Sequence, residues 1–194
     1  MIIGITGGTG CGKTTLLELL RQQGAVLLDC DAIYHRLLQE DATLLAAIEA
    51  RFPGTVEGGT LQRKKLGAIV FGDKAALADL NKITHGAVTA EVIRLLTPEP
   101  RLAAIDAIGL FESGLDKLCK LTVAVNAPLD ARVQRLMARD HITEEYARSH
   151  ISAQPSPAEF ATRCDYILEN DGTLEDFQQK CLAFLTRMGI MGNI

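Results

Sequence analysis

The sequence predicts an α/β fold in which a parallel sheet is flanked by helices. Short apolar segments alternate with longer stretches in which apolar residues recur at helical spacing. This alternation is typical of parallel strands joined by crossover helices. The first apolar segment, residues 2–6, also runs into a glycine-rich turn that opens a helix. Together these observations predict a single domain built on a five-stranded parallel sheet.

Five segments fit the strands of this sheet, and much of the remaining chain fits helices. The predicted strands cover residues 2–6, 25–28, 102–105, 121–125 and 166–168. Residues 41–96 need no strand of the sheet and are predicted to be mostly helical, with N-caps at Asp41, Thr60 and Asp73. A loop between two of these helices is marked by Gly54, Gly58 and Gly59. We therefore expect a helical subdomain inserted into the α/β domain.

Polar residues predict the boundaries of the later helices. Asn126 is expected to cap a helix that starts near Pro128, and Thr173 is expected to cap the closing helix. A further helix is expected over residues 143–153, and the segment Gln154-Pro-Ser-Pro should break it. The polar hairpin that ends at this break is a candidate for a mobile lid.

Size, charge and composition exclude several classes of function. The chain has 194 residues, of which 47% are hydrophobic, so one sizeable core can be buried. The formal net charge of −4 argues against general nucleic-acid binding, which favours a basic surface. The apolar runs are too short to span a membrane, and we expect no signal peptide because a core strand starts at residue 2. The five cysteines lack paired spacing, so a reducing cytoplasm is expected rather than a zinc site or disulfide framework.

The segment Ile-Thr-Gly-Gly-Thr-Gly-Cys-Gly-Lys-Thr-Thr, residues 5–15, carries the most specific local motif. Gly7 and the later Gly12-Lys13-Thr14 have the spacing of a phosphate-binding loop. Its glycines let backbone N–H groups surround a polyphosphate, and the following helix adds the positive end of its dipole. Lys13 would bind the β- and γ-phosphates, and the Thr14 hydroxyl would bind Mg²⁺. Against the alternative of a turn without a ligand, we predict a nucleoside triphosphate bound by Gly8, Thr9, Gly10, Cys11, Gly12, Lys13, Thr14 and Thr15.

A kinase with such a loop also needs a carboxylate to orient or deprotonate the acceptor hydroxyl. Asp29 and Asp31 follow the second predicted strand, at the sheet edge where ligands bind in open α/β folds. We favour Asp31 as the base, because Asp29 lies nearer the strand and could cap the next helix. In the alternative interpretation, both residues only cap that helix. A guanine-specific switch is not expected, because its Asn-Lys-x-Asp signature is missing from the sequence.

A kinase also needs positive charge near the transferring phosphoryl group. Arg135 and Arg139 are four residues apart on a predicted helix, so they share one face, and Arg132 precedes them. Arg135 and Arg139 are candidates for this charge; the alternative is a solvated helix face. Asp106 ends the third predicted strand, where structural capping and a second role near Mg²⁺ are both possible.

Several segments resemble the dephospho-coenzyme A kinase family, and their order is more specific than the phosphate loop alone. Besides that loop they are Asp29-Cys-Asp31, Gly59-Thr-Leu-Gln-Arg63, residues 66–71, Leu80-Asn81 with His85, residues 135–140, residues 151–154 and residues 165–172. The resemblance runs nearly from end to end. It implies a P-loop kinase fold that transfers a phosphoryl group from ATP to the ribose 3′-hydroxyl of dephospho-coenzyme A, the last step of coenzyme A biosynthesis.

The resemblance also implies three parts of one domain. These are a core (1–40, 101–128 and 165–194), a helical acceptor-binding subdomain (41–100) and a lid (129–164). On the donor side, Lys13, Arg135 and Arg139 would act on the phosphates, and Asn170 would lie near the adenine. On the acceptor side, the implied contacts are Asp31 as base, Arg63, His85 and Glu112.

The sequence departs from the family pattern at a few positions. Gly86 stands where a proline usually follows His85, and Phe160 replaces a basic residue. The family's Pro-Leu-Leu-Phe-Glu segment appears as Ala107-Ile-Gly-Leu-Phe-Glu112, so only its end is kept. Alternatives are therefore another small P-loop kinase acting on a nucleoside or nucleotide, or a non-catalytic ATP-binding regulatory module. In every case we expect a small-molecule partner, no nucleic acid or membrane, and a monomer or weak homo-oligomer.

Overall fold

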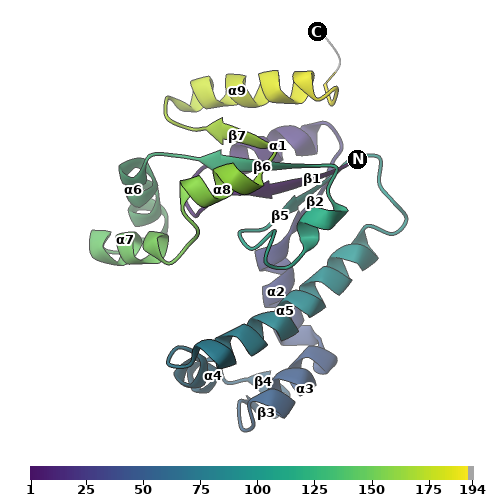
Figure 1. Cartoon of the computed structure of the whole chain (residues 1–194), viewed down its shortest axis with the longest axis vertical. Helices are drawn as coiled ribbons and strands as arrows, with labels where there is room; N and C mark the ends of the chain where they lie inside the picture. The colour runs from purple at the N-terminus through teal and green to yellow at the C-terminus, as the bar shows by residue number, and fades with distance from the viewer. Residues whose placement is uncertain (192–194) are drawn as a thin grey trace. The chain divides into compact units, whose positions relative to one another are not determined.

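The computed structural model describes residues 1–191, and two compact units can be distinguished in it (Figure 1). The sheet unit contains Met1–Leu27, Pro100–Leu110 and the chain from Leu115 onward. The helical unit contains Leu28–Glu99 and Phe111–Gly114. Within residues 1–191, no helix is both long and apolar enough to cross a lipid bilayer.

A five-stranded sheet forms the centre of the sheet unit and confirms the predicted fold. Its strands are β2 (Val26–Asp29), β5 (Ala103–Asp106), β1 (Ile2–Thr6), β6 (Leu121–Asn126) and β7 (Tyr166–Glu169), in that spatial order. Strand β1 pairs in parallel with both β5 and β6, and β6 pairs in parallel with β7. Because the strands are parallel, the loops that follow β1 and β6 emerge at the same edge of the sheet.

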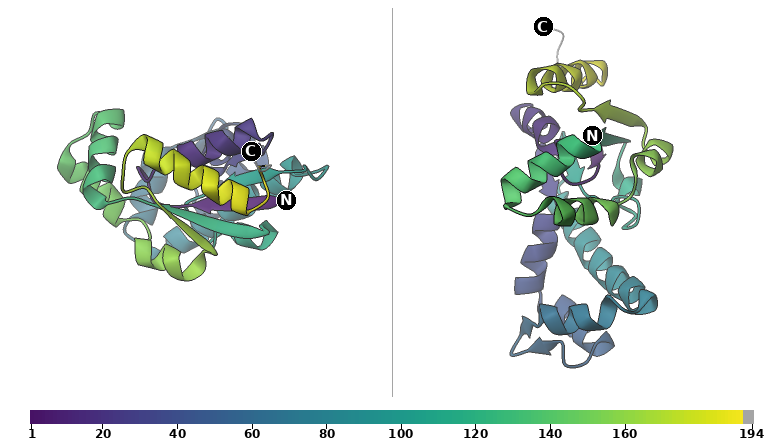
Figure 2. Two further views of the ribbon diagram at one scale, coloured as in Figure 1. Left: turned by 90° about the horizontal axis from the view of Figure 1, so that it is seen from above. Right: turned by 90° about the vertical axis from the view of Figure 1, so that its left-hand side faces the viewer.

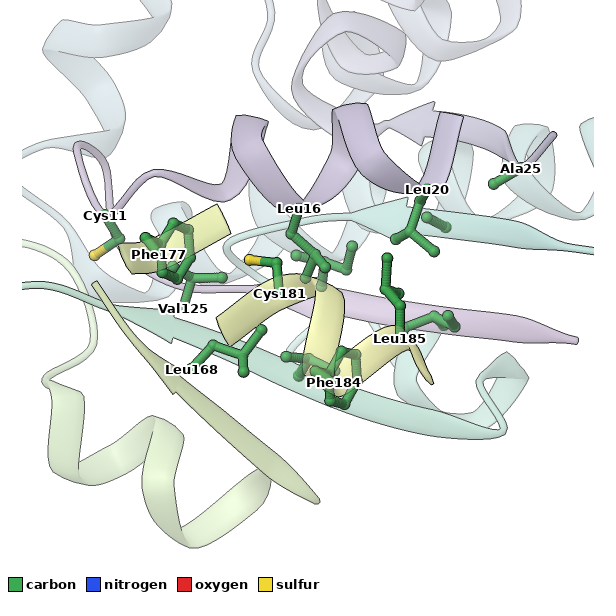
Figure 3. Packing of buried hydrophobic residues seen from close by; sticks show 14 of the residues in the cluster. Cys11, Leu16, Leu20, Ala25, Val125, Leu168, Phe177, Cys181, Phe184 and Leu185 are labelled. Atoms are coloured by element: carbon green, nitrogen blue, oxygen red, sulfur yellow. The ribbon is translucent and has the colours of Figure 1, made fainter. Parts of the chain in front are cut away.

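Helices α1 (Lys13–Gln22) and α9 (Leu174–Arg187) cover one face of this sheet, side by side (Figure 2). Figure 3 shows the side chains between them, where Leu16 and Leu20 of α1 meet Phe177 and Leu185 of α9. Fully burying each of these side chains contributes about 1.5–3 kcal/mol. On the opposite face, Gly4 leaves space for other side chains of the sheet unit, since an added Cβ would lie 2.8 Å from Leu110. This packing fixes both elements that flank the glycine-rich loop.

The helical unit is organised around the long helix α5 (Lys74–Leu95). Helices α2 (Cys30–Glu40), α3 (Ala42–Arg51) and α4 (Arg63–Val70) all pack against it. The predicted caps Asp41 and Asp73 are confirmed: each side chain accepts hydrogen bonds from two backbone N–H groups of the helix that follows it.

The prediction for the segment before α4 was wrong. Thr60 does not cap a helix but lies in β4 (Thr60–Leu61), which pairs antiparallel with β3 (Val56–Glu57). Gly58 and Gly59, both at positive φ, form the two-residue turn of this hairpin. A two-residue turn of this kind matches the twist of paired strands. The glycines predicted a loop here, but they did not reveal the hairpin. Helix α4 begins after Gln62, whose side chain makes no capping hydrogen bond.

Three further differences lie in the sheet unit. Asn126 does not cap α6 (Leu129–Asp140); it ends β6, and its side chain donates to Glu169 Oε1 at 3.3 Å. Helix α7 (Glu144–Ser152) ends near the predicted break, but α8 (Pro157–Arg163) follows with a capping box formed by Ser156 and Glu159. A short 3-10 helix, η1 (Leu115–Leu118), was also not predicted. The sequence signals for these elements are only a few residues long.

Candidate active site

The glycine-rich loop joins β1 to α1, and its backbone conformation requires glycine. Gly7, Gly10 and Gly12 have φ values of 127°, 80° and 95°. An added Cβ would lie 2.3 Å from the Val125 carbonyl oxygen at Gly7 and 2.3 Å from Asn170 Nδ2 at Gly12. Helix α1 starts directly after Gly12 without a side-chain cap, so its first N–H groups are available to an anion. The loop therefore has the local structure expected of a phosphate site.

Lys13 is held at this loop by two oxygen atoms. Its Nζ donates to the Gly7 carbonyl at 2.8 Å and lies 3.8 Å from Asp106 Oδ1. Strand pairing explains the second contact, because Asp106 at the end of β5 is opposite Ile5 of β1. The carboxylate of Asp106 thus ends its strand next to the loop lysine, where it can orient that lysine or approach a cation.

Two arginines of α6 contact the loop through its carbonyl groups. Arg132 Nε donates to the Thr9 carbonyl at 2.9 Å, and Arg135 Nη1 donates to the Gly10 carbonyl at 3.0 Å. Arg132 is only 4% exposed. Their spacing of three residues puts both guanidinium groups on the face of α6 that meets the loop. Sequence reasoning noted Arg132 but gave it no role.

Gln154, in the segment that follows α7, also contacts the loop. Its Oε1 accepts from the Thr9 backbone N–H at 2.9 Å and from Arg132 Nη2 at 3.0 Å. Its Nε2 donates a hydrogen bond to Thr9 Oγ1 at 2.6 Å. The resemblance had placed Gln154 in the lid, and the structure connects it to both α6 and the loop.

Asn170 lies against the loop from the end of β7. Its Nδ2 donates to the Cys11 carbonyl at 2.8 Å, and its backbone N–H donates to the Asn126 carbonyl at 2.8 Å. The expected position near an adenine stays a prediction. Burial raises the pKa of the Cys11 thiol, so this side chain is neutral and suits a packing role.

Arg139 lies further along α6 than the arginines that reach the loop. Its guanidinium donates to both carboxylate oxygens of the adjacent Asp140, at 2.7 and 2.8 Å, and is largely exposed. The hydrogen bonds from Arg139 lower the pKa of Asp140. The structure therefore brings Arg135, but not Arg139, into contact with the loop, and a catalytic role of Arg139 stays a prediction.

The candidate base lies in the first turn of α2, in the helical unit. Asp29 caps this helix as expected, because its Oδ1 accepts from the Ala32 N–H at 2.9 Å. Asp31 follows with an exposed side chain. The role of Asp31 as the base stays a prediction.

Two of the predicted acceptor residues line one cavity of the helical unit. This cavity has a volume of about 500 Å³ and is lined by Ala78, Asn81, Lys82, His85, Gly86, Glu112 and Ser113. His85 and Glu112 are thus brought together, whereas Arg63 does not line the cavity and begins α4. Lys82 was not predicted as a site residue; its one-turn spacing from His85 on a helix was the available signal.

A model of the dephospho-CoA kinase family matches residues 1–176 of the chain. The chain belongs to this family. Dephospho-CoA kinase from Syntrophotalea carbinolica is 35% identical over 97% of this chain and 92% of its own length. A crystal structure of a Thermus thermophilus protein has a TM-score of 0.80 and 35% identity, covering 99% of this chain and 98% of that one. Dephospho-CoA kinase from Campylobacter jejuni has a TM-score of 0.68 and 28% identity, with 98% of both chains covered.

Two positions that depart from the dephospho-CoA kinase pattern have different surroundings. Phe160 is 4% exposed in α8, so the hydrophobic side chain is buried where the family usually has a basic one. Gly86 lies in α5, and an added Cβ there would meet no atom within 4 Å. The first change adds apolar packing, whereas the second leaves open space beside His85.

Proposed function

We propose that this protein transfers the terminal phosphoryl group of ATP to the ribose 3′-hydroxyl of dephospho-CoA, giving CoA and ADP. Membership of the dephospho-CoA kinase family carries the proposal. The loop between β1 and α1 supports the donor half, because it combines left-handed glycines, a helix N-terminus and a lysine. The family as a whole uses ATP, and the reaction would be the last step of CoA biosynthesis.

On the donor side, Lys13 would hold the triphosphate together with the N–H groups of residues 8–15 other than that of Thr9, which donates to Gln154. The Thr14 hydroxyl and the Asp106 carboxylate are oxygen donors of the kind that Mg²⁺ prefers. Residues 1–191 contain no cluster of three or more acidic, histidine or cysteine side chains for a metal. That absence suits an ion held mainly by phosphates and water. When bound, Mg²⁺ would neutralise charge on the β- and γ-phosphates.

On the acceptor side, we assign the base to Asp31. Its carboxylate would accept the proton of the 3′-hydroxyl as that oxygen bonds to the γ-phosphorus and the bond to the ADP oxygen breaks. His85 and Glu112 would contact the acceptor from the cavity, with Lys82 as an additional cation and Arg63 at the start of α4. Arg135 and Arg139 would stabilise the transferring phosphoryl group. For this, the Arg139 guanidinium would have to leave the Asp140 carboxylate and bind the phosphoryl group instead.

The test measures ADP production with ATP, Mg²⁺ and dephospho-CoA, beside nucleoside monophosphates and shikimate as rival acceptors. We expect turnover with dephospho-CoA alone, and a product phosphorylated on the ribose 3′-hydroxyl by phosphorus NMR. Turnover only with a rival acceptor would contradict the assigned substrate and leave the kinase assignment intact. Tight ATP binding with no transfer to any acceptor would instead identify a regulatory module.

A further inference from the structure

Arg132 stands out because it is a buried cation whose hydrogen bonds go to neutral oxygens. The residue is 4% exposed, and within residues 1–191 it forms no ion pair with an Asp or Glu side chain. The bonds that satisfy it go to two neutral oxygens, the Thr9 carbonyl and Gln154 Oε1. Burying a guanidinium group carries a desolvation penalty, so we expect this one to have a role that depends on its charge or its geometry. Its position against the phosphate loop indicates what that role is.

The contacts of Arg132 determine how one peptide group of the loop is oriented. Arg132 pulls the Thr9 carbonyl toward α6, so the N–H of the same peptide, which belongs to Gly10, points to the opposite side. The neighbouring Gly10 carbonyl is turned toward α6 in the same way by Arg135. Carbonyl oxygens repel phosphate and N–H groups attract it. Turning the carbonyls away therefore prepares this stretch for an anion.

The carboxamide of Gln154 completes the arrangement. Its Oε1 receives two donors, the Thr9 N–H and Arg132 Nη2, so the amide orientation is fixed and Nε2 must face Thr9 Oγ1. Thr9 is therefore bonded at its N–H, its carbonyl and its hydroxyl. Two of the three bonds come from the segment after α7 and one from α6. Helices α6 and α7 share a small core that includes Val133, Leu136, Ala147 and Ile151, so they pack as one hairpin.

We propose that Arg132, Gln154 and Thr9 form a clasp that joins the α6–α7 hairpin to the phosphate loop and holds the Thr9–Gly10 peptide in the orientation that binds the triphosphate. Arg132 and Gln154 are positioning residues in this proposal, because they act on the phosphates through the loop. The inference rests on the part of the proposed function that concerns ATP and is independent of the acceptor.

The test compares Arg132→Met and Gln154→Met with the wild type by calorimetric titration with ATP and Mg²⁺. Each change keeps much of the side-chain volume and removes the bonds to Thr9. Arg132→Met removes a charge-assisted hydrogen bond that orients the loop, so it should weaken ATP binding by about 10-fold or more. Gln154→Met breaks the clasp from its other end and should act in the same direction.

Hydrogen exchange of the Thr9 amide in the nucleotide-free protein supplies a second readout. This N–H donates to Gln154 Oε1, so its exchange should be faster in both variants, even where the melting temperature is unchanged. The matched control is Arg148→Met, which removes an exposed arginine of α7 that pairs with Glu144 and Asp130. It should alter neither ATP affinity nor exchange at Thr9. Arg132→Lys, which keeps the charge but loses the forked geometry, should recover only part of the affinity.

Three outcomes would overturn the proposal. If folded Arg132→Met and Gln154→Met bind ATP within twofold of the wild type, the clasp does not prepare the loop. Tighter ATP binding in either variant would mean that Gln154 competes with the nucleotide. If Arg132→Met does not fold, a wild-type affinity in Gln154→Met is enough to reject the proposal. Because no acceptor is present, these results are separate from a failure of the transfer reaction.

Discussion

One pair of arginines in each unit illustrates two different ways of holding a guanidinium group. In the sheet unit, Arg132 and Arg135 donate to the carbonyl oxygens of Thr9 and Gly10 in the phosphate loop. In the helical unit, Arg36 and Arg94 both pair with one carboxylate, that of Glu91, at 2.5 and 2.7 Å. The first pair is held by neutral groups and keeps its positive charge available. The second pair shares the charge of Glu91, and Arg36 also lies 3.6 Å from Glu40; the Arg36–Glu91 pair links α2 to α5 as a brace.

The difference fits the ligand that we propose for each region. A polyphosphate site gains from cations whose charge is not cancelled by a neighbouring carboxylate. The cavity beside His85, which we propose for the acceptor, instead collects side chains of α5 with Glu112 and Ser113 around open space. The proposed donor half is therefore built largely from backbone geometry, and the proposed acceptor half from side chains. Substitutions should separate the two halves.

Asp31→Asn should produce the largest effect on catalysis while sparing the sheet unit. A positioned base contributes about 10²–10⁴-fold, so we expect turnover to fall by at least about 100-fold. ATP affinity, measured by calorimetry, should stay close to that of the wild type, because the loop is unchanged. Turnover like that of the wild type would remove Asp31 from the role of base.

A matched pair of glycine substitutions compares the backbone of the two regions. Gly12→Ala places a Cβ 2.3 Å from Asn170 Nδ2 at a φ of 95°, so ATP affinity should fall by about 10-fold or more. Gly86→Ala meets no atom within 4 Å and lies inside α5, so it should stabilise the protein by up to about 1 kcal/mol. ATP titration and urea unfolding measure the two effects. An unchanged ATP affinity in Gly12→Ala would contradict the role of the loop.

Lys82→Met tests whether the cavity is used by the acceptor. If Lys82 binds an anionic group of dephospho-CoA, the KM for that acceptor should rise by about 10-fold. The KM for ATP should not change, because Lys82 belongs to the helical unit. Steady-state kinetics with each substrate varied in turn gives both values. If only the KM for ATP rises, Lys82 acts at the ATP site and its assignment to the acceptor is wrong.

The smallest effect concerns the Glu91 brace and its dependence on pH. The hydrogen bonds from Arg94 and Arg36 lower the pKa of Glu91 to about 2. Because the folded pKa is depressed, the brace stabilises the fold above the ordinary pKa of Glu, near pH 4.5, and loses its contribution as pH falls toward 2. The difference in unfolding free energy between wild type and Glu91→Gln should therefore be largest near pH 7 and shrink below pH 4.5. A difference that does not vary with pH would show that the brace is not electrostatic.

The sequence by itself determined the sheet, the phosphate loop and most helix caps. These features depend on neighbouring residues: the order of glycines, the apolar period and single capping side chains such as Asp41 and Asp73. The family resemblance was equally local, since short segments in a fixed order carried it. Thr60 and Asn126 were misassigned because the side chain of each can cap a helix. In the structure, Thr60 instead pairs with the neighbouring strand β3, and Asn126 ends β6 and contacts Glu169 of β7.

Only the tertiary structure decided which arginines of α6 contact the phosphate loop. In the sequence, Arg132, Arg135 and Arg139 form one series, and nothing local separates them. The fold turns the first two toward Thr9 and Gly10, whereas Arg139 pairs with its neighbour Asp140. The contact between Gln154 and Thr9 joins residues 145 positions apart. Such contacts depend on how α6 and α7 pack against the loop, which no local pattern encodes.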